Sequence, residues 1–142
     1  MPKFVVSACL AGVPCRYDGK SKPNQHVVRL VKEQKALPLC PELLAGLGLP
    51  RPCIERLGDR IHTKEGIDLT AALRRGAEKA LLKAQKAGCT IAILKQRSPS
   101  CGAGQIYDGT FTGTVTTGDG IWTELLRQAG FTVLTEEEIP QC

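Results

Sequence analysis

The sequence predicts a three-layer α/β/α sandwich, in which helices cover a mostly parallel, Rossmann-like sheet and a small β-hairpin stands beside it. Short apolar, β-branched segments alternate along the chain with segments of helical periodicity, and this alternation is typical of parallel sheets. The chain has 142 residues, of which 42% are hydrophobic and 23% are charged, as in ordinary soluble globular proteins. We therefore expect one domain that spans residues 1–142.

The first part of the chain predicts a strand, a helix and a second strand. Residues 4–8 form an apolar, β-branched run, and a loop rich in turn-forming residues follows it. Residues 24–35 place their apolar side chains on one helical face, and Asn24 is positioned to cap this helix. Residues 36–39 then predict a second strand almost at once. A unit of this kind makes its two strands parallel.

The middle of the chain contains one short and one long predicted helix. Pro41 suits the first turn of a short helix that ends before the Gly- and Pro-rich residues 46–52. Residues 53–66 are polar and of mixed charge, which predicts an irregular segment or a short hairpin. The longest helix covers residues 69–87 and ends at Gly88, and we expect the basic side chains off its apolar face to lie in solvent.

The last part of the chain adds two strands, a hairpin and a helix. Residues 90–94 predict a buried strand that breaks abruptly into Ser, Pro, Cys and Gly. Residues 105–117 centre on an Asp108-Gly109 turn and predict a hairpin that hangs as a flap beside the strand ends. A helix over residues 119–130 and a strand over residues 131–134 complete the predicted fold.

Charge and composition limit the partners that we expect. The net charge of +5 comes from scattered Lys and Arg side chains, which allows an anionic substrate without requiring one. The aromatic residues are few and are not interleaved with basic ones, so nucleic acid is not the expected partner. No apolar stretch is long enough to cross a membrane and residues 1–4 lack the pattern of a signal peptide, so we expect a cytoplasmic protein. The sequence leaves the oligomeric state open.

The seven cysteines are the most unusual feature of the composition. In the reducing cytoplasm, cysteines serve as metal ligands or reactive groups more often than as disulfides, and their odd number supports this interpretation. No Cys-x-x-Cys pair is present, which argues against a zinc ribbon and against a thioredoxin-type dithiol. The sequence therefore predicts a metal site or reactive thiols rather than a disulfide framework.

Three of the cysteines, Cys9, Cys40 and Cys101, follow predicted strands. Because the carboxyl ends of parallel strands meet at one edge of a sheet, we expect these thiols to converge. Three thiolates suit a zinc ion with an open fourth position or an iron–sulfur cluster with one iron left unligated. Zinc commonly recruits histidine, but we expect both His26 and His62 at the surface. This favours iron and sulfide, although it leaves zinc open.

The other cysteines have weaker contexts. Cys15 lies in the same loop as Cys9 and is either a fourth ligand, which would close the site and make it structural, or a thiol beside the site. Cys53 lies in the polar segment without a clear context, and Cys89 precedes a predicted strand and is expected in the core. Cys142 ends the sequence and has no expected role.

Several polar residues accompany the cysteines. Glu42, two residues after Cys40, either interacts with the first turn of a helix or transfers a proton to a group held at the metal. Ser98 and Ser100 could each hydrogen-bond to a cluster sulfur or to water, or could only stabilise their loop. A further polar group, expected to position the substrate or to fix the first loop, consists of Arg16, Tyr17 and Asp18.

These residues belong to five motifs that occur in a specific order along nearly the whole chain. The motifs are Ser7-Ala8-Cys9-Leu10-Ala11-Gly12, Arg16-Tyr17-Asp18-Gly19, Cys40-Pro41-Glu42, Arg97-Ser98-Pro99-Ser100-Cys101-Gly102 and Gly118-Asp119-Gly120. In both order and spacing they resemble the motifs of the thiouracil desulfidase family, a family of small bacterial proteins.

The resemblance implies a 4Fe-4S cluster held by only three cysteines, Cys9, Cys40 and Cys101. In that family the fourth iron is free and takes the sulfur of a thiocarbonyl substrate, so the reaction is a non-redox hydrolysis that gives uracil and sulfide. The acid/base glutamate of the family corresponds to Glu42, and its catalytic serine corresponds to Ser98, with Ser100 as the alternative. The implied substrate is a small-molecule thiolated pyrimidine base or nucleotide.

Two other functions are compatible with the same residues. In the first, Cys15 completes a four-cysteine iron–sulfur or zinc site that only holds loops together, and the protein is not an enzyme. In the second, the three-cysteine cluster acts on another substrate, such as a thiolated nucleotide or a molecule to be dehydrated. Replacement of Cys15 and assays with a panel of thiolated bases and nucleotides distinguish these functions.

Overall fold

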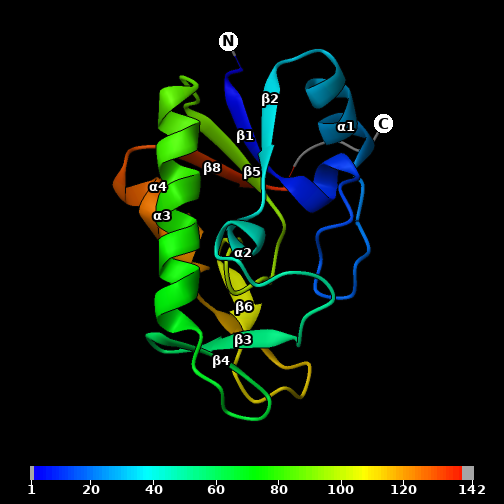
Figure 1. Ribbon diagram of the computed structural model, residues 1–142. Helices are drawn as coiled ribbons and strands as arrows, with labels where there is room; N and C mark the ends of the chain where they lie inside the picture. The colour runs from blue at the N-terminus through cyan, green and yellow to red at the C-terminus, as the bar shows by residue number, and fades with distance from the viewer. Residues whose placement is uncertain (1, 139–142) are drawn as a thin grey trace.

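The computed structural model of the protein describes residues 2–138, and these contain a four-stranded parallel sheet (Figure 1). The strands are ordered β2-β1-β5-β8, and each neighbouring pair runs parallel. Their bounds are Phe4–Ser7 for β1, Ala36–Leu39 for β2, Ile91–Leu94 for β5 and Thr132–Thr135 for β8. The predicted parallel, Rossmann-like sheet is confirmed, so the carboxyl ends of these strands meet at one edge.

Helices cover both faces of the sheet. They are α1 (Gln25–Lys32), α2 (Pro41–Leu44), α3 (Thr70–Lys86), α4 (Ile121–Gln128) and a 3₁₀ helix η1 (Ala8–Ala11). Successive strand residues point to opposite faces, so Val5 and Ala92 join a hydrophobic cluster with α3 and α4. Val6 and Ile93 point the other way, into a cluster with α1 and η1. Figure 1 shows α3 and α4 on one side of the sheet and α1 on the other, which confirms the three layers.

Local sequence sets the ends of several elements. The Asn24 side chain accepts hydrogen bonds from the backbone N–H groups of His26 at 3.0 Å and Val27 at 3.2 Å, which confirms the predicted cap of α1. After α3, Gly88 adopts a φ of 82°, the left-handed conformation that ends many helices. Strand β1 is one residue shorter than predicted because η1 begins at Ala8, so Cys9 lies in a helical turn rather than in an open loop.

Two antiparallel hairpins stand beside the sheet. Strands β3 (Ile54–Leu57) and β4 (Arg60–Thr63) show that the polar segment over residues 53–66 forms the short hairpin rather than the irregular alternative. Strands β6 (Gln105–Tyr107) and β7 (Val115–Thr117) confirm the second predicted hairpin.

The second hairpin differs from the prediction at its tip, where a long loop replaces the tight Asp108-Gly109 turn. The reason lies in the first hairpin, whose buried Glu55 accepts hydrogen bonds through Oε1 from the N–H groups of Gly109 at 3.0 Å and Phe111 at 3.1 Å. A buried carboxylate needs such partners, and a two-residue turn would not supply both of them.

Gly76 lets the short helix α2 approach α3 closely. A Cβ atom at this position would lie 2.2 Å from the carbonyl oxygen of Pro41 and 2.7 Å from the backbone nitrogen of Ala45. Helix α2 begins directly after Cys40 and carries Glu42. The contact at Gly76 therefore sets where these two residues stand at the edge of the sheet.

We expect Gly76→Ala to lower the free energy of unfolding by about 1–2 kcal/mol, because the overlap of the methyl group with the α2 backbone outweighs the higher helix propensity of alanine. Urea unfolding measures this change. Lys79→Ala, on the exposed side of the same helix, should change the free energy of unfolding by less than about 0.5 kcal/mol. A Gly76→Ala protein at least as stable as the wild type would contradict this role of Gly76.

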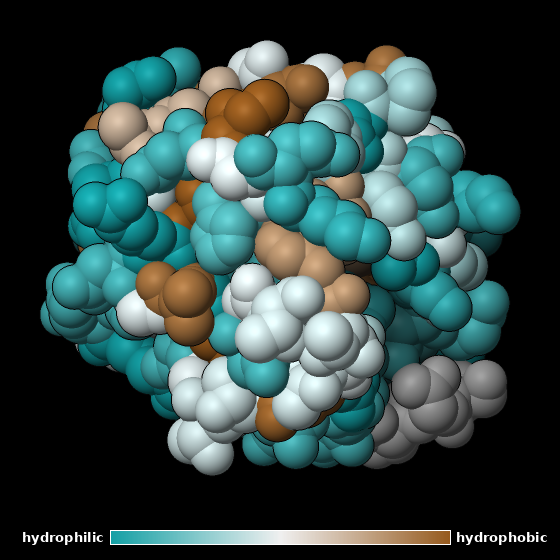
Figure 2. All heavy atoms as spheres, turned by 90° about the horizontal axis from the view of Figure 1, so that it is seen from below, coloured by the Kyte–Doolittle hydropathy of each residue, from teal (hydrophilic) through white to brown (hydrophobic). Residues whose placement is uncertain are grey.

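The surface is of mixed polarity. The basic side chains of α3 lie in solvent, as predicted, namely Arg74, Arg75, Lys79, Lys83 and Lys86. Over residues 2–138, no helix combines the length and the apolar character that crossing a membrane requires. Figure 2 shows the molecule from below, where apolar side chains gather in separate small groups between hydrophilic ones.

Candidate active site

A pocket opens at the carboxyl edge of the sheet, among the segments that follow β1, β2 and β5. Its volume is about 160 Å³, and residues from all three segments line it. Open parallel sheets bind their ligands at this edge. The cysteines that line the pocket are Cys9, Cys15, Cys40, Cys53 and Cys101.

The three cysteines predicted to converge do come together here. Cys9 lies in η1 after β1, Cys40 is the N-cap residue of α2 after β2, and Cys101 lies in the turn that follows β5. Cys9 and Cys101 are buried and Cys40 is half-buried, and all three are free thiols. Free thiols at one pocket form a donor set that suits iron or zinc.

Cys15 lies among these thiols. A hydrogen bond from Cys40 lowers the pKa of Cys15, but a hydrogen bond with Cys9 and burial raise it more, to about 11. The same hydrogen bond, together with burial, raises the pKa of the Cys40 thiol well above its usual range. Burial also raises the pKa of the Cys101 thiol. These thiols therefore keep their protons at neutral pH in the absence of metal, and a metal must displace the protons on binding.

The kind of ligands at the pocket helps to decide between a single metal ion and an iron–sulfur cluster. In the described part of the chain, no three or more His, Cys, Asp or Glu side chains are arranged to hold one metal ion. A cluster binds each thiolate through a different iron, so its cysteines stand farther apart than the ligands of a single ion. His26 and His62 are half-buried and do not line the pocket. The donors at the pocket are thiols without histidine, a set that an iron–sulfur cluster accepts.

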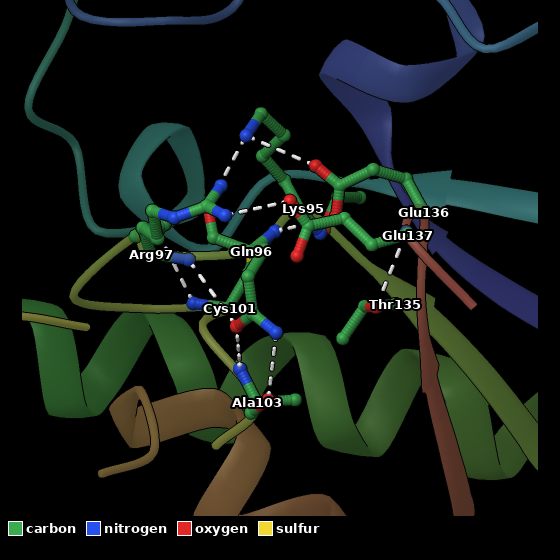
Figure 3. Close-up of polar contacts among 10 residues, drawn as sticks. Lys95, Gln96, Arg97, Cys101, Ala103, Thr135, Glu136 and Glu137 are labelled. Atoms are coloured by element: carbon green, nitrogen blue, oxygen red, sulfur yellow. Dashed lines mark hydrogen bonds and ion pairs between the residues drawn. The ribbon is translucent and has the colours of Figure 1, made fainter. Parts of the chain in front are cut away.

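The turn that carries Cys101 is held by the buried residue Gln96 (Figure 3). Gln96 Oε1 accepts a hydrogen bond from the Ala103 N–H at 2.7 Å, and Gln96 Nε2 donates to the Ala103 carbonyl at 2.9 Å. Inside the turn, Ser98 Oγ accepts hydrogen bonds from the N–H groups of Ser100 at 3.1 Å and Cys101 at 3.2 Å. These bonds fix the Cys101 backbone from both sides.

Two ion pairs tie the start of this turn to the segment after β8 (Figure 3). Lys95 Nζ lies 3.0 Å from Glu136 Oε2, and Arg97 Nη2 lies 2.6 Å from Glu137 Oε2. Arg97 has a φ of 70°, which is uncommon for a residue with a side chain and is found at functional turns. Both cations line the pocket, but each is already balanced by a carboxylate.

Gly120, the glycine directly before α4, supports the same turn from another side. A Cβ atom on Gly120 would lie 2.2 Å from the carbonyl carbon of Ser100, so a side chain does not fit there. The first N–H groups of α4 donate to the turn, from Ile121 to the Pro99 carbonyl and from Trp122 to the Ser100 carbonyl, each at 2.9 Å. The first turn of a helix leaves such N–H groups without partners of its own. The glycine-containing motif before α4 therefore serves the Cys101 turn.

Glu42 lies on the pocket wall in a network that the sequence did not predict. Arg51 donates to Glu42 Oε1 from Nε at 3.0 Å and from Nη2 at 2.9 Å, and Ser100 Oγ donates to Glu42 Oε2 at 2.9 Å. The Glu42 and Arg51 side chains are only 13% and 4% exposed. Removal of one partner from such a buried ion pair commonly costs about 3–5 kcal/mol of stability. A carboxylate is thus held firmly beside Cys40.

The two candidate serines have different surroundings. Ser98 lines the pocket, and its oxygen accepts the two loop hydrogen bonds, which leaves its O–H free to donate to a ligand. Ser100 is fully buried and donates its hydrogen to Glu42. A substrate in the pocket could therefore reach Ser98, whereas Ser100 lies behind the Glu42 carboxylate.

The three residues predicted on the first loop separate into two groups. Arg16 and Tyr17 line the pocket, and the Arg16 guanidinium lies 5.9 Å from the centre of the Tyr17 ring. Asp18 does not line it, and its carboxylate instead accepts a hydrogen bond from the Lys20 N–H at 2.9 Å. The geometry supports contact with a ligand for Arg16 and Tyr17 and the loop-fixing alternative for Asp18.

Sequence reasoning missed three residues that shape the pocket: Arg51, Gln96 and Ser7. Ser7 Oγ accepts a hydrogen bond from the Lys95 N–H at 2.9 Å, and a hydrogen bond from Ser7 lowers the pKa of Cys101 against the effect of burial. Arg51 lies between Pro50 and Pro52, and this position could have indicated its role. The two prolines restrict the backbone on either side of the arginine and so hold its charge in one place. Ser7 begins the motif that contains Cys9, although the motif did not indicate its role, and Gln96 carries no such signal.

The remaining cysteines are placed as follows. Cys53 is exposed and lines the pocket. Cys89 lies in the core, as predicted, and its thiol donates to the Phe4 carbonyl at 3.5 Å. Cys142 lies outside the described residues.

Comparisons with known proteins agree with the motifs. A family model described as 2-thiouracil desulfurase matches residues 4–138. The Bacillus subtilis (strain 168) protein YbbK, named as uncharacterized, is 41% identical over an alignment of 146 residues, gaps included, that covers 96% of this chain and 97% of YbbK. A solved structure of the 4Fe-4S-dependent thiouracil desulfidase TudS (DUF523Vcz) is 46% identical with a TM-score of 0.93, and the match covers 99% of this chain and 94% of that one.

Proposed function

Because the chain belongs to the 2-thiouracil desulfurase family of enzymes, we propose that it hydrolyses the carbon–sulfur bond of a thiolated pyrimidine without net oxidation or reduction. Water supplies the oxygen and its two protons leave with the sulfur, so the thiocarbonyl becomes a carbonyl and thiouracil gives uracil and hydrogen sulfide. The observation that carries this proposal is the convergence of Cys9, Cys40 and Cys101 with Glu42 in one pocket.

The proposed cofactor is a 4Fe-4S cluster, on which the similar TudS protein depends. Cys9, Cys40 and Cys101 would hold it, since their free thiols come from three separate strand ends and line the same pocket. When bound there, the cluster would supply an iron without a protein ligand, a Lewis acid that would polarise the carbon–sulfur bond.

The residues of the pocket transfer protons and bind the substrate. Glu42 takes a proton from the attacking water and returns it to the departing sulfur, because its carboxylate stands at the pocket wall next to Cys40. Ser98 donates its free O–H to the substrate and orients the ring. Arg16 and Tyr17 at the first loop contact the ring or the group attached to it.

A panel of substrates tests the proposal. The protein, purified and loaded with iron and sulfide without oxygen, is incubated with 2-thiouracil, 4-thiouracil, 4-thiouridine and the thiouridine monophosphates. Sulfide release from at least one of these compounds is the expected result, and the order of their kcat/KM values gives the preferred form. Failure of a cluster-loaded protein on every compound would overturn the desulfidase function.

Cys15 distinguishes this function from a structural four-cysteine site. We expect Cys15→Ser to keep about four irons per chain and to keep releasing sulfide, because three other cysteines suffice as ligands. The iron content per chain is measured by mass spectrometry of the metal and by the visible absorption of the cluster. Loss of iron or of folded protein in Cys15→Ser would instead support the closed, non-catalytic site, in which this buried thiol is the fourth ligand.

A further inference from the structure

Nearly all N–H groups of the Arg51 guanidinium donate hydrogen bonds to other groups of the protein. Nη1 donates to the Gly48 carbonyl at 3.1 Å, and Nη2 donates to the Cys15 carbonyl at 2.9 Å in addition to its bond with Glu42. A guanidinium has about five N–H donors, and Nε is also bound to Glu42. Although Arg51 forms part of the pocket wall, it is only 4% exposed. It is therefore suited to act through the residues that it holds rather than on a ligand.

The Glu42 carboxylate is held in an unsymmetrical way. A carboxylate offers about four acceptor positions, shared equally between its two oxygens. Oε1 receives both hydrogen bonds from Arg51, whereas Oε2 receives only the one from Ser100. The one acceptor position that these bonds leave open is on Oε2. Arg51 and Ser100 together thus decide which oxygen can accept a proton.

We propose that Arg51 and Ser100 are positioning residues that present Oε2 of Glu42, and not Oε1, to the water and the sulfur of the reaction. The inference rests on the proposed function of Glu42 as the proton carrier. Arg51 also donates its backbone N–H to the Tyr17 carbonyl at 2.9 Å, so it fixes the first loop of the pocket relative to Glu42. Without the guanidinium the carboxylate can rotate, and a displacement of about 1 Å at a reacting group can lower the rate by about 10²-fold.

The test compares Arg51→Met with a matched variant at a second buried arginine. Arg56 pairs with Glu124 at 2.7 Å and donates to the Asp119 carbonyl at 2.8 Å, but it does not line the pocket. Per loaded cluster, Arg51→Met should lower kcat by about 10- to 100-fold with KM changed by less than about 3-fold, and Arg51→Lys should restore part of kcat. Arg56→Met should lower the unfolding temperature without lowering kcat. Iron content and unfolding temperature are recorded for every variant.

A double-mutant cycle with Glu42→Gln separates the possible outcomes. If Arg51 acts through Glu42, its replacement should matter little once Glu42 is gone. The double variant Arg51→Met/Glu42→Gln should then have a kcat no more than about twofold below that of Glu42→Gln alone. Equal effects of Arg51→Met in both backgrounds would overturn the inference, because Arg51 would then act on the substrate itself. Normal kcat in Arg51→Met together with a slow Glu42→Gln would also overturn it, while the function of Glu42 would stand. A fast Glu42→Gln would refute the role of Glu42 instead.

Ser100→Ala keeps the test decisive if Arg51→Met does not fold or does not take up iron. The hydroxyl of Ser100 donates to Oε2 and contributes nothing to the pocket wall. We expect Ser100→Ala to load normally and to lose about 3- to 10-fold in kcat at nearly constant KM. An unchanged kcat in this variant would overturn the selection of Oε2.

Discussion

Glu42→Gln is expected to lower the rate of sulfide release from 4-thiouracil by about 10²- to 10⁴-fold while the cluster stays bound, because an amide cannot carry a proton. The amide has nearly the shape of the carboxylate, and its oxygen can still accept hydrogen bonds from Arg51. Iron content should therefore match the wild type. Sulfide release and uracil formation, both normalised to bound iron, measure the effect.

Glu124→Gln is the matched control for this variant. Glu124 also pairs with a buried arginine, Arg56, but it lies on α4 and does not line the pocket. It should release sulfide at the wild-type rate. If Glu42→Gln kept more than about a tenth of the wild-type rate per cluster, proton transfer through Glu42 would be excluded.

Each of the variants Cys9→Ser, Cys40→Ser and Cys101→Ser is expected to lose most of its iron and all measurable sulfide release. A serine hydroxyl is a poor substitute for a thiolate on iron, and two cysteines are too few to retain the cluster. Iron, acid-labile sulfide and the visible absorption of the anaerobically prepared proteins measure the loss.

Cys89→Ser controls for the removal of a buried thiol. Cys89 is as buried as Cys9 and Cys101, but it lies in the hydrophobic core with residues of α3 and the sheet. This variant should keep its iron and its activity, although burial of a hydroxyl in the core should lower its stability. A full complement of iron in any of the three pocket variants would show that the corresponding cysteine is not a ligand.

Local sequence patterns predicted most of the fold. Strand β2 and helix α2 coincide with the predicted residues, because the fixed φ of Pro41 suits the first turn of a helix. The convergence of Cys9, Cys40 and Cys101 followed from the parallel strand order, which brings strand ends together whatever their separation in the sequence.

These local patterns did not predict the contacts between segments that are distant in the sequence. The loop between β6 and β7 takes its shape from Glu55, which lies in another hairpin. In the same way, the partner of Glu42 is Arg51, and only the folded chain shows that Ser100 rather than Ser98 binds this carboxylate. Neither pairing follows a helical or strand period, so no local rule predicts it.

The most direct measurement is one anaerobic incubation of the iron-loaded protein with 4-thiouracil, without an electron donor or acceptor. Uracil, sulfide and bound iron are quantified in the same sample. A non-redox desulfidase with a three-cysteine cluster should release uracil and sulfide in equal amounts from protein that holds about four irons per chain. Sulfide release that requires a reductant, or a zinc-loaded protein that leaves 4-thiouracil intact, would contradict hydrolysis at a cluster held by Cys9, Cys40 and Cys101.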